Sequence, residues 1–313
     1  MPDRVLYDKV QEAKKQLNRV IRGKEQVLQL LFAALFAEGH VLMEDVPGTG
    51  KTTLAKALAL SVTADFSRIQ FTPDLLPADI LGSSIYSPKE GTFFFRQGPV
   101  FTNLLLADEI NRASPRTQSA LLEAMNERQV SIEGKELKLI KPFLVIATQN
   151  PIEYYGTYPL PEAQLDRFAI RLSLGYPDEE SELQILKDRR GNDPLEALQP
   201  VLDCDEIRRI QEEVRMVEIE DSLADYMMQV IRATRESNEI RLGASPRALL
   251  MLSRCAQSMA WLDSRMFVKP DDILALIQPL LAHRLVMTLE SKHAGITPAM
   301  VLEEIVKKIR IPV

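Results

Sequence analysis

The segment that spans residues 44–53, with the sequence EDVPGTGKTT, constrains the fold of this 313-residue chain more than any other. It follows a short apolar run at 40–43 and leads into a stretch with helical spacing at 51–60. Because Gly48 and Gly50 carry no Cβ atom, the backbone can curl and direct several N–H groups toward one point, next to the positive end of the helix. A glycine loop between a strand and a helix is typical of a site that binds phosphate groups.

The residues of this loop predict a nucleoside triphosphate as the ligand. Lys51 would reach the β- and γ-phosphates, and Thr52 would bind Mg²⁺. Asp45 occupies the position of the motif's first glycine, a departure that leaves unchanged the half of the loop that surrounds the phosphates. The alternative is a glycine-rich turn with a solvated lysine. The expected nucleotide-binding residues are Pro47, Gly48, Thr49, Gly50, Lys51, Thr52 and Thr53.

A pair of acidic residues follows a second apolar run and favours hydrolysis. The run at 104–107 ends in Asp108 and Glu109. Burial of charged groups at the end of a strand costs free energy unless a cation or a polarised water offsets the cost. We therefore expect Asp108 to bind Mg²⁺ through water, and Glu109 to act as the base that polarises the attacking water. A kinase or a nucleotide switch would not need the second acid.

Short apolar runs recur along the first half of the chain and predict an α/β fold. Besides the run at 40–43 they lie at 67–71, 103–107, 143–148 and 168–174, and helix-like segments such as 115–126 separate them. Continuous runs of this length indicate a parallel sheet that is covered by helices on both faces. Residues 8–38 have helical spacing and are expected to form a helix before the first strand.

The remaining patterns divide the chain into two predicted domains. Two segments, 85–95 and 130–139, have turn-prone centres and are expected to be β-hairpins. Beyond residue 177 the strand patterns stop and helical periodicity takes over. We expect an α/β nucleotide-binding core at 1–177 and an all-helical lid domain at 178–313. The expected lid helices are 179–190, 205–215, 223–236, 246–262, 271–288 and 298–309.

Charge and cysteine content exclude several classes of protein. The chain has 38 basic and 44 acidic residues, so it lacks the basic excess of a general nucleic-acid-binding surface. Residues 1–177 carry 20 of each sign, whereas 178–313 carry 18 basic and 24 acidic residues. Cys204 and Cys255 cannot form a disulfide framework or a zinc cluster, which favours a cytoplasmic setting. We expect no signal peptide and no membrane insertion, because no apolar run approaches about 18 residues.

Five motifs together resemble one known family. They are residues 47–52 (PGTGKT), 108–113 (DEINRA), 147–151 (ATQNP), 160–168 (LPEAQLDRF) and 243–248 (GASPRA). The set, in this order, resembles the MoxR branch of the AAA+ ATPases, from about Val20 to the C-terminus. The resemblance implies a five-stranded αβα core with hairpin insertions, a helical lid, and a homo-oligomeric ring, usually hexameric, with ATP at the subunit interfaces.

The resemblance also implies roles for single residues. Asn150 matches sensor 1, and the alternative is a polar residue that ends a strand before Pro151. Arg167 matches the arginine finger, which stabilises charge on a neighbour's ATP; the alternative is an ion pair with Asp166 or Glu162. Ile21 belongs to residues 20–23, which resemble the family's adenine-contacting turn.

Arg247 matches sensor 2, and residues 245–246 (SP) predict a helix start just before it. Residues 114–116 (SPR) have the same arrangement without an assigned role. The sequence does not decide whether Arg247 acts within its own subunit or on a neighbour.

The family implies Mg²⁺-dependent ATP hydrolysis by a ring that acts as a chaperone-like ATPase in the maturation or remodelling of protein complexes, including metal-cofactor insertion. Its partner would be a client protein or a separate polypeptide with a von Willebrand factor A domain. The ATPase subunit of a metal chelatase and a nucleic-acid remodeller share this ring plan and remain alternatives. A scaffold that binds ATP without hydrolysis is a different class, which Glu109 and Arg167 disfavour. Residues 93–95 (FFF) are a candidate contact surface, although at least one of these rings is expected to be buried.

Overall fold

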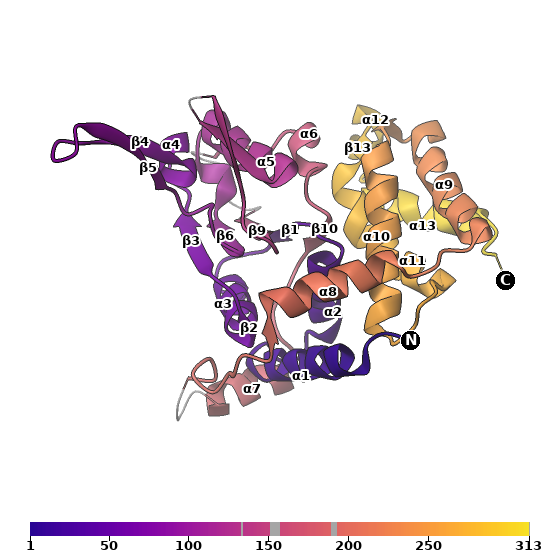
Figure 1. The fold of residues 1–313 in the computed structure, drawn as a ribbon. Helices are drawn as coiled ribbons and strands as arrows, with labels where there is room; N and C mark the ends of the chain where they lie inside the picture. Colours follow the sequence, from indigo (N-terminus) through magenta and orange to yellow (C-terminus); the bar gives the residue numbers. More distant parts are fainter. Residues whose placement is uncertain (133, 151–156, 189–192, 313) are drawn as a thin grey trace.

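The computed structural model describes residues 1–132, 134–150, 157–188 and 193–312. Its centre is a five-stranded sheet in the order β10-β1-β9-β6-β3, in which all neighbouring strands are parallel (Figure 1). The predicted α/β fold with a five-stranded parallel sheet is confirmed. The strands are β1 (Val41–Glu44), β3 (Phe66–Gln70), β6 (Leu104–Asp108), β9 (Leu144–Gln149) and β10 (Ile170–Leu172).

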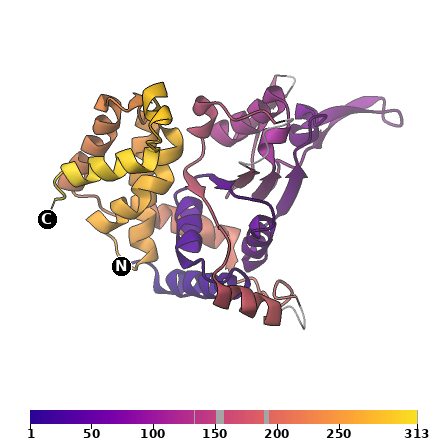
Figure 2. The same cartoon turned by 180° about the vertical axis from the view of Figure 1, so that it is seen from behind.

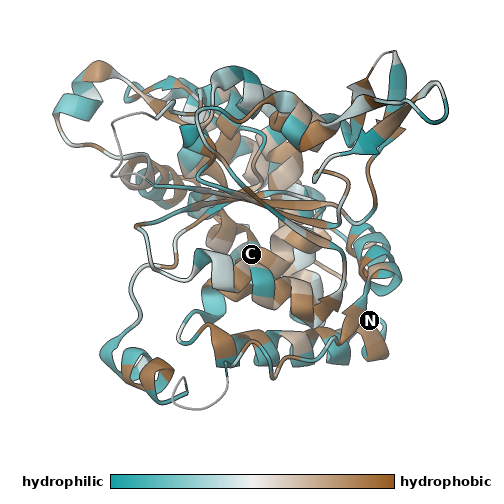
Figure 3. Cartoon of the chain, turned by 90° about the vertical axis from the view of Figure 1, so that its left-hand side faces the viewer, coloured by the Kyte–Doolittle hydropathy of each residue, from teal (hydrophilic) through white to brown (hydrophobic). Residues whose placement is uncertain are grey.

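Alternate residues of the central strands face two separate parts of the hydrophobic core. Leu104 and Leu106 of β6 pack in one cluster with α2 (Glu25–Phe36) and α3 (Lys51–Ser61). Leu105 and Ala107 pack in the other, with α5 (Pro115–Glu127). This burial on both faces explains why the strands read as continuous apolar runs. The strands are accordingly hydrophobic along much of their length in Figure 3.

The helix expected at 8–38 is interrupted, so this prediction was wrong in its continuity. The structure has α1 (Arg4–Val20) and α2, separated by a turn in which Gly23 has φ +68°. A Cβ atom on Gly23 would lie 2.8 Å from Oγ of Ser181, at the start of α7 (Glu179–Asp188). The turn therefore needs glycine both for its backbone conformation and for its close approach to α7.

Both predicted hairpins are present. The first is formed by β4 (Gly82–Ser87) and β5 (Thr92–Gln97), and it projects away from the rest of the chain (Figure 2). The second is formed by β7 (Gln129–Ile132) and β8 (Lys135–Lys138), with Glu133 outside the described residues. The first hairpin follows α4 (Pro77–Leu81), and the second joins α5 to β9.

The C-terminal part is helical, as predicted, with two small additions. The helix expected at 271–288 ends earlier, at Leu281, where a 3₁₀ turn and β13 (Val286–Met287) follow, and β13 pairs with β12 (Ile240–Leu242). A second short pair joins β11 (Leu202–Asp203) to β2 (Val62–Thr63). The other helices are α6 (Glu162–Leu165), α8 (Cys204–Arg215), α9 (Asp221–Glu236), α10 (Pro246–Leu262), α11 (Pro270–Leu281), α12 (Leu289–His293) and α13 (Pro298–Lys308).

Large aromatic side chains join the helical part to the N-terminal helices. Trp261 of α10 is fully buried, and its ring lies in edge contact with Phe36 of α2 and Tyr7 of α1. Its indole N–H donates to Oε2 of Glu213 at 2.8 Å. Among the helices that the structure describes, none combines the length and the apolar character needed to cross a bilayer.

Candidate active site

The phosphate loop leaves the carboxyl end of β1 and enters α3. Gly48 has φ +86° and Gly50 has φ +96°, both in the left-handed region that favours glycine. A Cβ atom at either position would meet no atom within 4 Å, so the space beside the loop is open. Nζ of Lys51 donates to the carbonyl oxygen of Asp45 at 2.6 Å, across the base of the loop. The loop thus has the open concave backbone that a phosphate group requires.

A cavity of about 420 Å³ adjoins this loop and extends toward the turn between α1 and α2. Ile21, expected at the adenine, lines the same cavity as the loop. Apolar side chains at one end and a glycine loop at the other suit a nucleotide, whose base is flat and whose phosphates are charged. Another cavity, of about 800 Å³ between α2, β10 and α11, contains none of the predicted site residues. The smaller cavity is lined by residues 19–22, 24, 48–50, 53, 174, 176, 177, 182, 185, 188, 193 and 194.

Asp45, the departure from the usual glycine motif, fastens the loop to the segment that leaves β10. Its carboxylate is buried and accepts hydrogen bonds from Oγ of Ser173 at 3.0 Å, from the backbone N–H of Leu174 and from the N–H of Gly175 at 3.1 Å. Leu174 and Tyr176 then line the cavity beside the loop. Asp45 therefore fixes one wall of the cavity relative to the phosphate loop.

Asp108 ends β6 at the same edge of the sheet and is held on both sides. Oγ1 of Thr148 on β9 donates to its Oδ1 at 2.6 Å, and Nη2 of Arg68 on β3 donates to its Oδ2 at 2.7 Å. The carboxylate is almost fully buried, so these donors offset the cost of removing its charge from water.

Glu109 has an uncommon backbone conformation for a residue with a side chain. Its φ is +57°, in the left-handed region, which costs roughly 1–2 kcal/mol for a residue other than glycine. Its N–H donates to Oγ1 of Thr148 at 2.9 Å. Gln70 and Arg112 donate to its Oε2 at 2.7 and 2.9 Å. Backbone strain of this kind concentrates at functional sites, and here it turns the Glu109 side chain toward Gln70 at the end of β3.

Asn150 follows β9, which lies between β1 and β6. Its side chain is buried at the sheet edge where both the loop and the acid pair lie. Gln149, the residue before it, donates to Oε1 of Glu44 at 2.8 Å. Pro151, part of the sensor 1 motif, lies outside the described residues.

Arg167 and Arg247 lie at the opposite edge of the sheet. Arg167 precedes β10, and the N–H of Ala169, two residues after it, donates to the carbonyl oxygen of His40, just before β1. Arg247, in the first turn of α10, donates to Oδ1 of Asn126, in the last turn of α5. Because β1 and β10 are parallel, the amino ends of both strands lie far from the phosphate loop, which follows the carboxyl end of β1.

The ion pair that was the alternative for Arg167 is not formed within the described part of the chain. Asp166 instead pairs with Arg284 at 2.9 Å, and Glu162 lies 3.7 Å from Arg241. The side chain of Arg167 is half-buried.

Sequence reasoning missed several residues that hold the acid pair. Arg68 and Gln70 belong to no motif, and they reach Asp108 and Glu109 because β3 pairs with β6 in a register that places Gln70 beside Asp108. Thr148 lay within a recognised motif, without a role assigned to it. The position of a polar residue at the end of a neighbouring strand is the one signal that could have identified them.

Comparison with known proteins identifies the family. Residues 40–170 match the family model described as "ATPase family associated with various cellular activities (AAA)", and residues 232–305 match the AAA lid domain. The chain is 42% identical over 306 residues to "Chaperone MoxR1" of Mycobacterium tuberculosis, which covers 95% of this chain and 81% of the relative. The chain belongs to the MoxR family of AAA ATPases.

Other relatives agree with this assignment. "Protein MoxR" of Paracoccus denitrificans is 30% identical, with 94% of each chain covered. The crystal structure of a protein from Cytophaga hutchinsonii superposes with a TM-score of 0.91 at 39% identity and covers 98% of this chain and 96% of that one. The MoxR-family fold, with its α/β ATPase core and helical lid, therefore extends over almost the whole chain, and the protein is an ATPase that binds ATP.

We predict that Asp45→Ala lowers both stability and nucleotide affinity. Loss of the carboxylate leaves the N–H groups of Leu174 and Gly175 without their acceptor, at a cost of about 1–3 kcal/mol for an unsatisfied buried group. Chemical denaturation should show a free energy of unfolding lower by about 2 kcal/mol, and fluorescent ATP should bind more weakly. As a matched control, Asp79→Ala removes an exposed acceptor for the N–H of Leu76. Equal effects of the two changes would contradict the role given to Asp45.

Proposed function

We propose that this MoxR-family ATPase works as a homo-oligomeric ring, hexameric as in the family plan, in which each ATP lies between two subunits. The observation that carries the proposal is that Arg167 and Arg247 lie at the sheet edge opposite the phosphate loop. Since β1 separates that edge from the loop, we expect neither arginine to reach the phosphates of its own subunit. A head-to-tail ring brings that edge of one subunit to the loop of the next, so both arginines act on the neighbour's ATP.

The donor set suits Mg²⁺ together with ATP. Thr52 lies in the first turn of α3 beside the open loop, and Asp108 presents a carboxylate at the same sheet edge, so both offer the oxygen ligands that Mg²⁺ prefers. When bound, Mg²⁺ neutralises charge on the β- and γ-phosphate oxygens. Asp108 would act through water, since Arg68 and Thr148 already occupy its two oxygens.

The chain's own residues have distinct tasks in this proposal. The backbone of residues 47–53 and the ammonium group of Lys51 bind the phosphates. Glu109 accepts the proton of the attacking water, and Asn150, at the end of the strand between the loop and the acid pair, orients that water. Arg167 and Arg247 of the neighbour stabilise the charge that develops on the transferred phosphoryl group.

We predict that Glu109→Gln retains ATP binding and loses turnover. The amide keeps the size of the side chain but cannot accept the proton, and a general base contributes roughly 10²–10⁴-fold to a rate. Fluorescent-nucleotide titration should give a Kd within about twofold of the unaltered protein, whereas phosphate release should fall at least about 100-fold. Hydrolysis at the original rate would refute Glu109 as the base.

We predict that rings mixed from Arg167→Ala and Lys51→Ala subunits regain activity that neither variant has alone. In a mixed ring, some sites combine the intact loop of the first variant with the intact arginine of the second. ATPase activity should therefore reach a maximum near equal mixing, with each unmixed variant as the control. If mixed rings assemble and remain inactive, Arg167 does not act between subunits.

The biological task that we propose is chaperone-like remodelling or maturation of protein complexes, including insertion of metal cofactors. The support comes from the relative "Chaperone MoxR1" and from the projecting β4–β5 hairpin. Phe93 is 72% exposed and packs against Tyr86, with ring centroids 5.2 Å apart, whereas Phe95 is half-buried against Phe101. Exposed aromatic rings on a projecting arm suit contact with a client protein or with a separate partner that has a von Willebrand factor A domain.

In this proposal the two domains have different tasks. Residues 1–177 form the nucleotide-binding core and residues 178–313 the lid, and a cycle of ATP binding and hydrolysis changes the angle between them. The metal-chelatase and nucleic-acid-remodeller alternatives differ from this proposal in the target, and the fold does not distinguish targets.

We predict that the Glu109→Gln protein, loaded with ATP, captures a protein client. The variant should hold the loaded state, so a tagged ring should retain a defined partner that ADP releases. The double variant with Phe93→Ser and Glu109→Gln should retain less of this partner, while it binds ATP as well as the Glu109→Gln protein does. Stimulation of hydrolysis by nucleic acid, with a steep salt dependence, would instead favour the nucleic-acid remodeller.

A further inference from the structure

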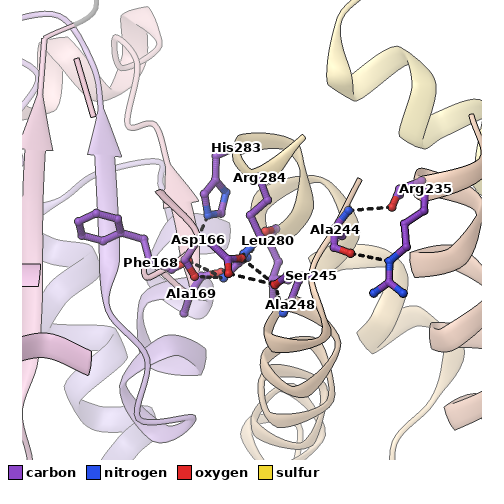
Figure 4. A network of polar contacts seen from close by, with 11 residues as sticks. Asp166, Phe168, Ala169, Arg235, Ala244, Ser245, Ala248, Leu280, His283 and Arg284 are labelled. Atoms are coloured by element: carbon purple, nitrogen blue, oxygen red, sulfur yellow. Dashed lines mark hydrogen bonds and ion pairs between the residues drawn. The ribbon is translucent and has the colours of Figure 1, made fainter. Parts of the chain in front are cut away.

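A buried arginine of the lid contacts the chain segment that carries Arg167. Arg284 lies in the 3₁₀ turn after α11, and its side chain is 2% exposed. Its Nε donates to Oδ1 of Asp166 at 2.9 Å. Its Nη2 donates to the carbonyl oxygen of Phe168 at 2.6 Å, and its Nη1 donates to that of Ala169 at 3.1 Å. The guanidinium group thus binds acceptors on Asp166, Phe168 and Ala169 (Figure 4). These residues precede and follow Arg167 in the chain.

The same carboxylate is tied to the helix that carries Arg247. Oγ of Ser245 donates to both oxygens of Asp166, at 3.1 and 3.0 Å, and it accepts the N–H of Ala248 at 3.2 Å as the N-cap of α10. Arg247 is the second residue of that helix. Asp166, which directly precedes Arg167, is therefore bound to Ser245, which lies two positions before Arg247.

The turn before α10 is itself held by α9. The N–H of Ala244 donates to Oγ1 of Thr234 at 3.0 Å, and its carbonyl oxygen accepts from Nε of Arg235 at 2.8 Å. A Cβ atom on Gly243 would lie 2.7 Å from the carbonyl oxygen of Thr234, so this turn packs tightly against α9. The start of α10 is consequently fixed on both sides, by α9 and by Asp166.

The small net stability expected from a buried ion pair favours a positioning role for this network. Burial lowers the pKa of Arg284, and the charge of Asp166 opposes that shift. A buried ion pair adds little net stability compared with apolar packing, but it fixes geometry and strongly penalises loss of one partner. Two cations that must meet one phosphoryl group need a fixed relative position, because displacement by about 1 Å can cost 100-fold in rate.

We propose that Asp166, Arg284 and Ser245 are positioning residues that hold Arg167 and Arg247 as one rigid unit for a neighbour's ATP. The inference rests on the proposed function, in which both arginines act between subunits. Arg284 sets the backbone on either side of Arg167, and Ser245 sets the first turn of α10. Because Arg167 belongs to the proposed core and Arg247 to the proposed lid, the network is the fixed point about which the angle between core and lid changes.

The test compares Ser245→Ala with Thr297→Ala. Thr297 caps α13 through the N–H of Met300 and precedes Pro298, so it matches Ser245 in capping chemistry, with no hydrogen bond to Asp166. Each change removes the side-chain cap of one helix, so the two variants lose similar local stability. We expect Ser245→Ala to lower kcat at least about tenfold, with the Kd for fluorescent ATP changed by less than about twofold. Thr297→Ala should leave kcat within about twofold of the original. Equal kcat values for the two variants would overturn the proposal.

Mixed rings then separate positioning from a general structural defect. A Ser245→Ala subunit has an intact loop and misplaced arginines, so mixing it with Lys51→Ala subunits should restore activity. Mixing it with Arg167→Ala subunits should not, because both would lack competent arginines. Asp166→Asn, which keeps the shape of the side chain and loses its charge, should behave in the same way. Restoration by neither partner would overturn the positioning role.

The controls also distinguish this inference from the proposed function. If Arg167→Ala and Lys51→Ala complement each other while Ser245→Ala and Asp166→Asn are not rescued by Lys51→Ala, the network alone is refuted. If Arg167→Ala and Lys51→Ala subunits fail to complement each other in assembled rings, the action of Arg167 on a neighbour's ATP is refuted. The positioning role of the network is then refuted with it.

Discussion

Parallel pairing of the five strands is the constraint on which the rest of the structure depends. Parallel strands end at the same edge of a sheet, so the polar residues that follow β1, β6 and β9 are forced into one place. Side chains bridge this edge: Arg171 to Glu44, Gln149 to Glu44, Thr148 to Asp108, and Arg68 to Asp108. Glu44 and Asp108 each accept hydrogen bonds from side chains on neighbouring strands, and this pairing makes a cluster of acids at the sheet edge tolerable.

The same constraint separates the arginines from the phosphate loop. A residue that precedes a strand lies at the amino edge, and the loop follows the carboxyl end of β1, so Arg167 and the loop lie at opposite ends of the strands within one subunit. Arg247 joins Arg167 at the amino edge through α5 and through the contacts of Ser245 and Arg284 with Asp166. On our proposal one chain therefore carries two halves of a catalytic site that face in opposite directions, and assembly completes the site.

The sequence predicted the elements whose patterns are local. Glycines, lysine and threonine in a fixed spacing indicated the loop, and buried runs indicated the strands to within a few residues. The helix expected at 8–38 ran across the break between α1 and α2 because apolar spacing continues across the turn, although Gly23 and the resemblance of residues 20–23 to a turn both marked it. The end of α11 was misplaced because a 3₁₀ turn continues the helical pattern for three more residues.

Contacts between distant residues could not be predicted in this way. Arg68 and Gln70 reach the acid pair through strand register, 39 or 40 residues away in the chain. Arg284 reaches Asp166 across 118 residues, and no spacing within either segment indicates that contact. Asp45 looked like a defect in a motif, and its role depends on donors 128–130 residues further along the chain.

The central claim is that the catalytic site is divided between subunits, and the dependence of ATPase activity on protein concentration tests it most directly. Activity per subunit and mass by light scattering would be measured over the same dilution series at saturating ATP. Our account predicts that activity per subunit falls in parallel with the fraction of assembled subunits and that isolated monomers bind ATP without hydrolysing it. Monomers that hydrolyse ATP at the full rate per subunit would contradict it.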